Sequence, residues 1–75
     1  METKNLYHNR KTLSVNGINY QPMSEEKYRI CSNAFDIINN LQENEYAPYY
    51  DRYIFKNCGK FYGVYVDDLT NYSEI

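Results

Sequence analysis

The amino-acid sequence predicts an α+β fold, in which an antiparallel sheet of about four strands in ββαββ order carries one helix packed on it. Three observations predict this fold. First, an Asn-Gly pair separates two segments in which apolar and polar residues alternate. Second, a long stretch with apolar residues at helical spacing follows a proline. Third, a glycine-containing turn joins two further segments with strand-like residues. The 75 residues predict a single domain over 1–75, with flexible ends at about 1–8 and 70–75.

The first hairpin is predicted over residues 11–21. Its centre is Asn16-Gly17, the preferred pair for a two-residue type I′ turn because both positions need positive φ. That turn places four apolar side chains on one face of the hairpin. The expected cross-strand pairs are Leu13 with Tyr20 and Val15 with Ile18.

One helix is predicted from about Ser24 to Gln42. Pro22 ends the preceding strand, and Ser24 is a good N-cap residue with two acidic residues after it. Apolar residues then follow helical spacing. They are Tyr28, Cys31, Ala34, Phe35, Ile38 and Leu41, and Ile30 and Ile37 widen the stripe.

After a predicted loop at about 43–50, in which Pro48 prevents the helix from continuing, a second hairpin is expected over 51–56 and 60–66. A three-residue bulged turn, Asn57-Cys58-Gly59, joins its strands. This register gives two largely apolar or aromatic faces. One face has Tyr53, Phe55, Phe61 and Tyr65, and the other has Ile54, Tyr62, Val64 and Val66. Residues 67–75 are predicted to be a polar end.

Tyrosine is the most informative residue type, because the chain has ten tyrosines and no tryptophan. Tyrosine combines a large ring with a hydroxyl and suits protein-binding surfaces. Four tyrosines fall in the acidic stretch 43–53, and this stretch is our predicted partner-binding site. Its residues are Glu43, Glu45, Tyr46, Tyr49, Tyr50, Asp51 and Tyr53. The alternative, in which these tyrosines pack locally over the helix end, remains open.

Self-association is also expected, because the apolar face of the helix is wider than one hairpin can cover and so small a domain buries little surface. The candidate dimer interface comes from the helix and the second hairpin. Its residues are Ile30, Ile37, Tyr62 and Val64.

No catalytic or metal-binding motif stands out. His8 is the only histidine and lies in a polar segment, Cys31 belongs to the apolar helix stripe, and Cys58 lies in a turn. The pair Asp67-Asp68 has no further ligands at a metal-binding spacing. We therefore expect no enzyme activity, no cofactor and no metal.

Charge and hydropathy disfavour nucleic-acid-binding and membrane proteins. The net charge of −2 does not favour nucleic-acid binding, and neither a signal peptide nor an apolar run of membrane-spanning length is present. The expectation is a cytoplasmic protein with reduced thiols. The many aromatic residues leave one alternative open, a small protein that binds single-stranded nucleic acid through an aromatic sheet face.

The usage of asparagine, lysine, isoleucine and tyrosine, as in residues 37–46, resembles that of small early proteins by which phages of low-GC Gram-positive bacteria block host machinery. In size and character the chain is most similar to the phage inhibitors of the host DNA sliding clamp. The resemblance implies a dimeric, non-enzymatic inhibitor that binds a host DNA-replication or other DNA-handling protein and sterically blocks its DNA site. An anti-defence protein or a small toxin is the alternative within this group. Two features depart from a DNA mimic, the low net charge and the bases Lys56 and Lys60.

Overall fold

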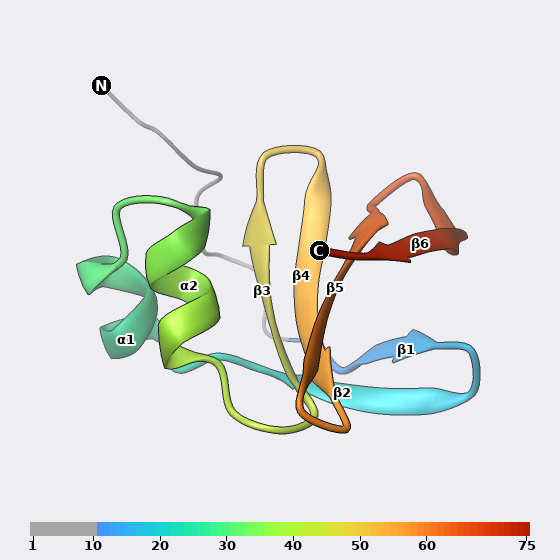
Figure 1. Ribbon diagram of the computed structural model, residues 1–75, viewed down its shortest axis with the longest axis horizontal. Coiled ribbons are helices and arrows are strands. Elements are labelled where there is room, and N and C mark those ends of the chain that lie inside the picture. Colours follow the sequence, from blue (N-terminus) through green and yellow to red (C-terminus); the bar gives the residue numbers. More distant parts are fainter. Residues whose placement is uncertain (1–10) are drawn as a thin grey trace.

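The computed structural model describes residues 11–75, which form a curled, six-stranded mixed sheet and two short helices (Figure 1). The strands lie in the sheet in chain order, and all neighbours are antiparallel except β2 and β3. The elements are β1 Leu13–Val15, β2 Ile18–Pro22, α1 Glu25–Ile30, α2 Ala34–Asn40, β3 Glu45–Tyr49, β4 Arg52–Asn57, β5 Lys60–Tyr65 and β6 Asp68–Glu74. The predicted four-stranded ββαββ sheet with one helix is therefore wrong.

The first hairpin is confirmed, register included. Strands β1 and β2 pair Leu13 with Tyr20 and Val15 with Ile18. The turn residues Asn16 and Gly17 have φ values of 54° and 80°, as a type I′ turn requires. Local turn chemistry was enough to determine this element.

The predicted single helix is two helices, because the chain is extended at Cys31 and a new helix begins after Asn33. The Asn33 side chain accepts a hydrogen bond from the Asp36 amide at 2.9 Å, and the Asp36 carboxylate accepts one from the Ser32 amide at 2.9 Å. This exchange resembles a capping box, which satisfies amide groups that a helix start leaves without partners.

The segment predicted as a loop contains a strand, β3, which lies between β2 and β4. Its pairing with β2 is parallel and short, covering only Gln21 with Glu45 and Pro22 with Tyr46. Helices α1 and α2 form the crossover between the two strands, as parallel pairing demands. Pro48 lies beyond the part of β3 that pairs with β2, at an edge-like position where a strand tolerates proline.

The second hairpin exists, but its predicted register is wrong. Asn57 pairs with Lys60, so the turn has two residues, Cys58 and Gly59, with φ values of 53° and 76°. The Glu43 carboxylate accepts hydrogen bonds from both turn amides. The shift by one residue places Tyr53, Phe55, Tyr62 and Val64 on a common face.

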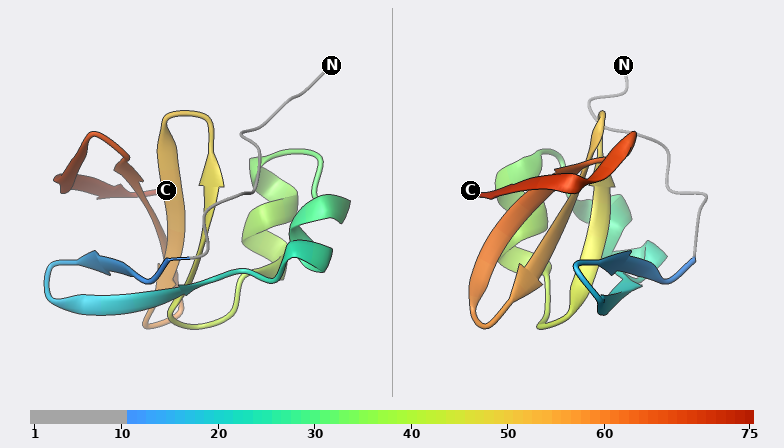
Figure 2. Two further views of the ribbon diagram at one scale, coloured as in Figure 1. Left: turned by 180° about the vertical axis from the view of Figure 1, so that it is seen from behind. Right: turned by 90° about the vertical axis from the view of Figure 1, so that its right-hand side faces the viewer.

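Both faces of the central strands are covered, with the helices on one side and the β1–β2 hairpin on the other (Figures 1 and 2). The helix-side core consists of Met23, Tyr28, Cys31, Ile37, Leu41, Ala47 and Ile54. The hairpin-side core consists of Leu13, Val15, Tyr20, Tyr46, Phe55 and Val64. Alternate residues of one strand therefore enter different cores, as Ile54 and Phe55 of β4 do.

The predicted polar end forms the edge strand β6, which pairs antiparallel with β5 and has a register shift between Val64 and Tyr65. Every residue of β6 is exposed. Residues 70–74, predicted as a flexible end, belong to this strand. The predicted flexible end at 1–8 lies outside the described residues.

Candidate functional site

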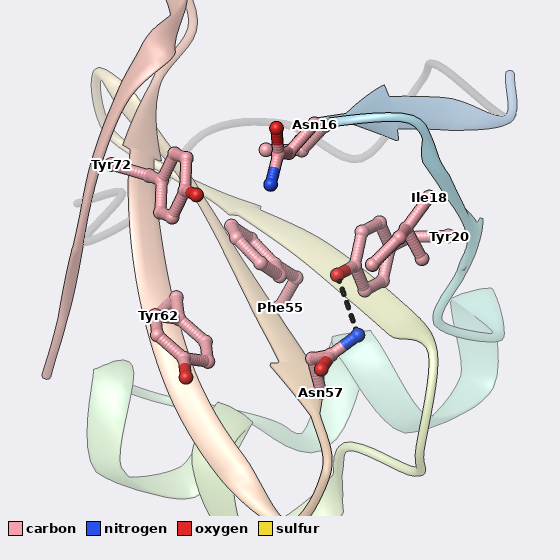
Figure 3. Close-up of a pocket in the computed structure, with 8 residues that line it drawn as sticks. Asn16, Ile18, Tyr20, Phe55, Asn57, Tyr62 and Tyr72 are labelled. Carbon is pink, nitrogen blue, oxygen red and sulfur yellow. Dashed lines mark hydrogen bonds between the residues drawn. The ribbon is translucent and has the colours of Figure 1, made fainter.

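An aromatic pocket opens between the β1–β2 hairpin and strands β4, β5 and β6 (Figure 3). Its volume is about 120 Å³. Its lining contains aromatic rings, two asparagine amides and two aliphatic side chains. The lining residues are Val15, Asn16, Ile18, Tyr20, Phe55, Asn57, Tyr62 and Tyr72.

The strand pairings bring these residues together. Phe55 of β4 lies directly across from Tyr62 of β5, and Tyr72 of β6 lies across from Val64. Cross-strand partners share one face of a sheet, so the rings of three strands lie on one face. The β1–β2 hairpin lies opposite these strands and contributes Tyr20 and its neighbours to the lining (Figure 3).

The rings form a buried floor and an open rim. Tyr20 and Phe55 make the floor, with centroids 4.6 Å apart and each 2% exposed. Tyr62 stacks on Phe55 at 5.4 Å, and the Tyr72 ring stands edge-on to Tyr62 at 6.2 Å. Tyr72 is 40% exposed and Tyr62 is half-buried, so both rim rings remain accessible to a binding partner.

Two polar side chains set the hydrogen-bonding character of the pocket. The Asn57 amide donates to the Tyr20 hydroxyl at 3.0 Å. Burial raises the pKa of the Tyr20 phenol above its ordinary value of 10.0, while the hydrogen bond from Asn57 lowers it. The phenol is therefore protonated at neutral pH. Asn16 extends its amide into the pocket from the hairpin turn (Figure 3).

The side chains that line the pocket are uncharged. Among the described residues that line the pocket, none carries a carboxylate, an imidazole, a thiol or an amine. Elsewhere in residues 11–75, no group of three or more His, Cys, Asp or Glu side chains could hold a metal ion. Cys31 and Cys58 are not joined by a disulfide, and the first is buried and the second exposed. His8 lies outside the described part of the chain.

The structure divides the predicted partner-binding site. Tyr46 is only 2% exposed, and its hydroxyl donates to the Lys11 carbonyl at 2.5 Å. The Tyr53 ring packs edge-on against Tyr46 at 5.3 Å and is half-buried. Tyr46 belongs to the hairpin-side core and Tyr53 packs against it. Both rings therefore pack locally, but on the side of the sheet away from the helices, and not over the helix end as the alternative expected.

The remaining residues of the predicted site lie at opposite ends of β3, which spans roughly 13 Å at about 3.3 Å per residue. Glu43 caps the Cys58-Gly59 turn, and Glu45 lies 3.9 Å from the Lys27 amine. The other end has Tyr49, half-buried against Tyr50, and the exposed Asp51. Tyr50 is 47% exposed. Of the residues in the predicted site, only Tyr50 and Asp51 are therefore both exposed to solvent and adjacent to each other.

The candidate dimer residues are divided as well. Ile37 and Val64 are fully buried inside the two cores and offer no side-chain surface to a second copy. Ile30 is 70% exposed at the end of α1, and Tyr62 lies at the pocket rim.

The sequence did not indicate the pocket as a unit, because its residues come from five separate strands and one hairpin turn. One signal was available. The pair Cys58-Gly59 can form a two-residue turn, which sets the β4–β5 register that brings Phe55 opposite Tyr62. Nothing local placed Tyr72 in a strand, because β6 has no apolar alternation.

Comparisons with protein-family models, with curated proteins and with solved structures found no match to this chain. None of the helices within residues 11–75 is long and apolar enough to cross a membrane.

Proposed function

We propose that this protein is a non-enzymatic binding protein that inhibits a partner by covering part of its surface, with the aromatic pocket at the centre of the contact. The observation that carries the proposal is the pair of accessible rings, Tyr62 and Tyr72, above a buried aromatic floor. Tyrosines in a concave site are typical energetic centres of protein interfaces. The exposed Ile18 beside them adds apolar contact area.

For the target we propose a host DNA-replication or other DNA-handling protein, with the bacterial sliding clamp as the first to test and the cytoplasm of an infected bacterium as the location. The resemblance in residue usage supports this target class. A group of exposed carboxylates at one end of the sheet supports it as well. The Val66 amide donates a hydrogen bond to the Asp51 carbonyl at 3.0 Å, and Asp67 and Asp68 follow Val66 directly. Three acidic residues, Asp51, Asp67 and Asp68, therefore lie near this contact.

The test measures binding to a purified sliding clamp from a low-GC Gram-positive bacterium and, in parallel, capture of proteins from a lysate of that bacterium. We expect the double variant Tyr62→Ala/Tyr72→Ala to lose at least about tenfold in affinity for the captured protein, as loss of a central aromatic anchor does. Glu26→Ala is the control, because Glu26 is exposed in the first turn of α1 and does not line the pocket.

A second pair of variants separates the pocket from the acidic end of the sheet. Tyr50→Asn and Asp51→Asn change that end alone, and asparagine tolerates the positive φ of 57° at Tyr50. Full binding by the pocket double variant, with loss in these two, would move the functional surface to the β3–β4 turn.

Binding of single-stranded nucleic acid is the alternative that the open rings support, since bases stack on accessible aromatic side chains. A fluorescent oligonucleotide tests it directly. Salt-dependent binding that is lost in Tyr62→Ala/Tyr72→Ala would replace the proposed protein partner with nucleic acid.

A further inference from the structure

The chain already contains contacts between cations and aromatic rings, outside the pocket. The Arg52 guanidinium lies 4.5 Å from the centroid of the Tyr65 ring and also donates to the Tyr65 hydroxyl at 2.8 Å. The Lys56 amine lies 5.3 Å from the Phe61 ring centroid. A positive group over an aromatic face is attracted by its π electrons, and a planar guanidinium can both stack and donate hydrogen bonds. Tyr65 therefore contacts one arginine in two ways, through its ring face and through its hydroxyl oxygen.

The pocket presents the same groups without a cation in its lining. Its rings offer π faces, its phenol oxygens and asparagine carbonyls can accept hydrogen bonds, and none of its lining residues is basic. The volume of about 120 Å³ is well above the roughly 10–15 Å³ that a cavity needs to hold one water molecule. The pocket therefore has room for a group of about the size of a guanidinium.

The charges beside the pocket favour a positive ligand on its β6 side. Glu74 lies directly across from Tyr62, so it shares the face that carries the pocket. Asp67 and Asp68 precede and begin the same strand, and residues 66–75 contain no lysine or arginine. Hydrogen bonds from the Thr70 side chain and amide lower the pKa of Asp68, which keeps that carboxylate charged.

One base, Lys60, lies on the same face. It is two residues before Tyr62 on β5, so it lies at the Glu74 end of this face, whereas Asp67 and Asp68 lie at the opposite end of β6. No base of β5 or β6 lies at the end with Asp67 and Asp68. A cation that approaches Tyr72 from that end meets carboxylates first.

We propose that the pocket binds the guanidinium group of an arginine side chain on the partner protein, which enters over Tyr72 from the β6 side. This assignment rests on the proposed function and names the chemistry of that same site. The guanidinium stacks against the rim rings and donates to the oxygens of Asn57 and of the phenols. Charge complementarity with Glu74 and the β5–β6 turn orients the basic partner segment.

The test is a titration followed by NMR of the isotopically labelled protein with N-acetyl-arginine methylamide. The matched probe is N-acetyl-citrulline methylamide, which has nearly the same shape and no charge. We expect saturable shifts at the Asn57 side-chain amide and at the backbone amides of Tyr62 and Tyr72. Binding of the citrulline probe should be about tenfold weaker at matched ionic strength.

Variants of the protein sharpen the test. Tyr72→Phe keeps the ring and should bind the arginine probe, whereas Tyr72→Leu keeps much of the apolar volume and should lose binding. Glu74→Gln should weaken the arginine complex, and Lys60→Gln should leave it unchanged or tighten it. The dispersion of the amide spectrum reports whether each variant is folded.

Three results would overturn the proposal: equal binding of the two probes, no localised shifts up to tens of millimolar probe, or tighter binding of adenosine monophosphate that requires Lys60. The proposed function is tested separately by capture of the partner. Pocket-dependent capture together with equal binding of the two small probes would retain the binding function and remove arginine as the ligand.

Discussion

At the scale of single residues, side chains that looked available for binding serve the fold. Glu43 illustrates this change of role most directly, because its carboxylate accepts hydrogen bonds from the amides of Cys58 and Gly59. Those amides lie in a turn whose two residues both have positive φ. A carboxylate contributed from before β3 thus satisfies turn amides between β4 and β5.

Removing that carboxylate should therefore destabilise the protein. For Glu43→Ala we expect a loss of about 1.5 kcal/mol in the free energy of unfolding, at the low end for hydrogen bonds to a charged group because Glu43 is exposed. Chemical denaturation measures it. Glu26→Ala is the control, because Glu26 is an exposed carboxylate in the first turn of α1.

Equal stability of the two variants would return Glu43 to the predicted partner-binding role. A loss that is abolished by high salt would indicate a long-range charge effect in place of the two turn hydrogen bonds.

At the scale of elements, the two-residue turns determine which side chains share a face. Asn16-Gly17 sets the β1–β2 register and Cys58-Gly59 sets the β4–β5 register. Both turns need positive φ, which a residue with a Cβ adopts only at a cost. Together these registers place Tyr20, Phe55 and Tyr62 in the pocket.

Two glycine variants test the importance of turn conformation. Gly17→Ala should destabilise the protein by about 1 kcal/mol, because the position has a φ of 80° although no heavy atom lies within 4 Å of the added Cβ. Gly63→Ala is the matched control. Gly63 lies in β5 outside the positive-φ region, and its Cβ would lie 3.7 Å from Arg52 Cδ, an ordinary contact.

Thermal unfolding of the two variants gives the comparison. A Gly17→Ala protein as stable as the Gly63→Ala protein would mean that the hairpin turn is not held in the type I′ conformation.

At the scale of the whole molecule, the central strands bury both faces, and the largest exposed apolar side chains lie elsewhere. Ile30 is 70% exposed and Phe35 is 69% exposed, on either side of the break between α1 and α2. Exposed apolar side chains this close in the chain are candidates for contact with a second copy. The predicted self-association therefore remains a prediction, with its centre moved to the helix break.

Sedimentation at micromolar concentration should show a species of twice the 9.0 kDa chain mass. The double variant Ile30→Ser/Phe35→Ser should sediment as a monomer, because it removes the apolar contact. Tyr72→Ser is the control and should remain dimeric. A wild-type monomer over the whole concentration range would leave Ile30 and Phe35 as exposed side chains of a single copy.

The sequence by itself determined the elements whose signals are local. The Asn-Gly turn gave the first hairpin in its correct register, and Ser24 gave the start of the first helix. The helix break also has a local signal, because Asn33 and Asp36 are capping residues for the start of a second helix. Apolar residues at helical spacing continue across the break, however, and this spacing favoured one long helix. Where two local signals compete, capping and periodicity in this case, the sequence alone does not rank them.

Only the tertiary structure decided where the non-local elements lie. Strand β3 exists because β2 and β4 provide hydrogen-bonding partners on its two sides, and β6 exists because β5 provides one. Neither segment has the alternation of a half-buried strand, since β3 enters both cores and β6 is exposed throughout. The pocket follows from those pairings, because its rings come from strands that are distant in the chain. The site therefore depends on backbone hydrogen bonds between segments that are distant in the chain. Such pairings cannot be recognised from local residue patterns.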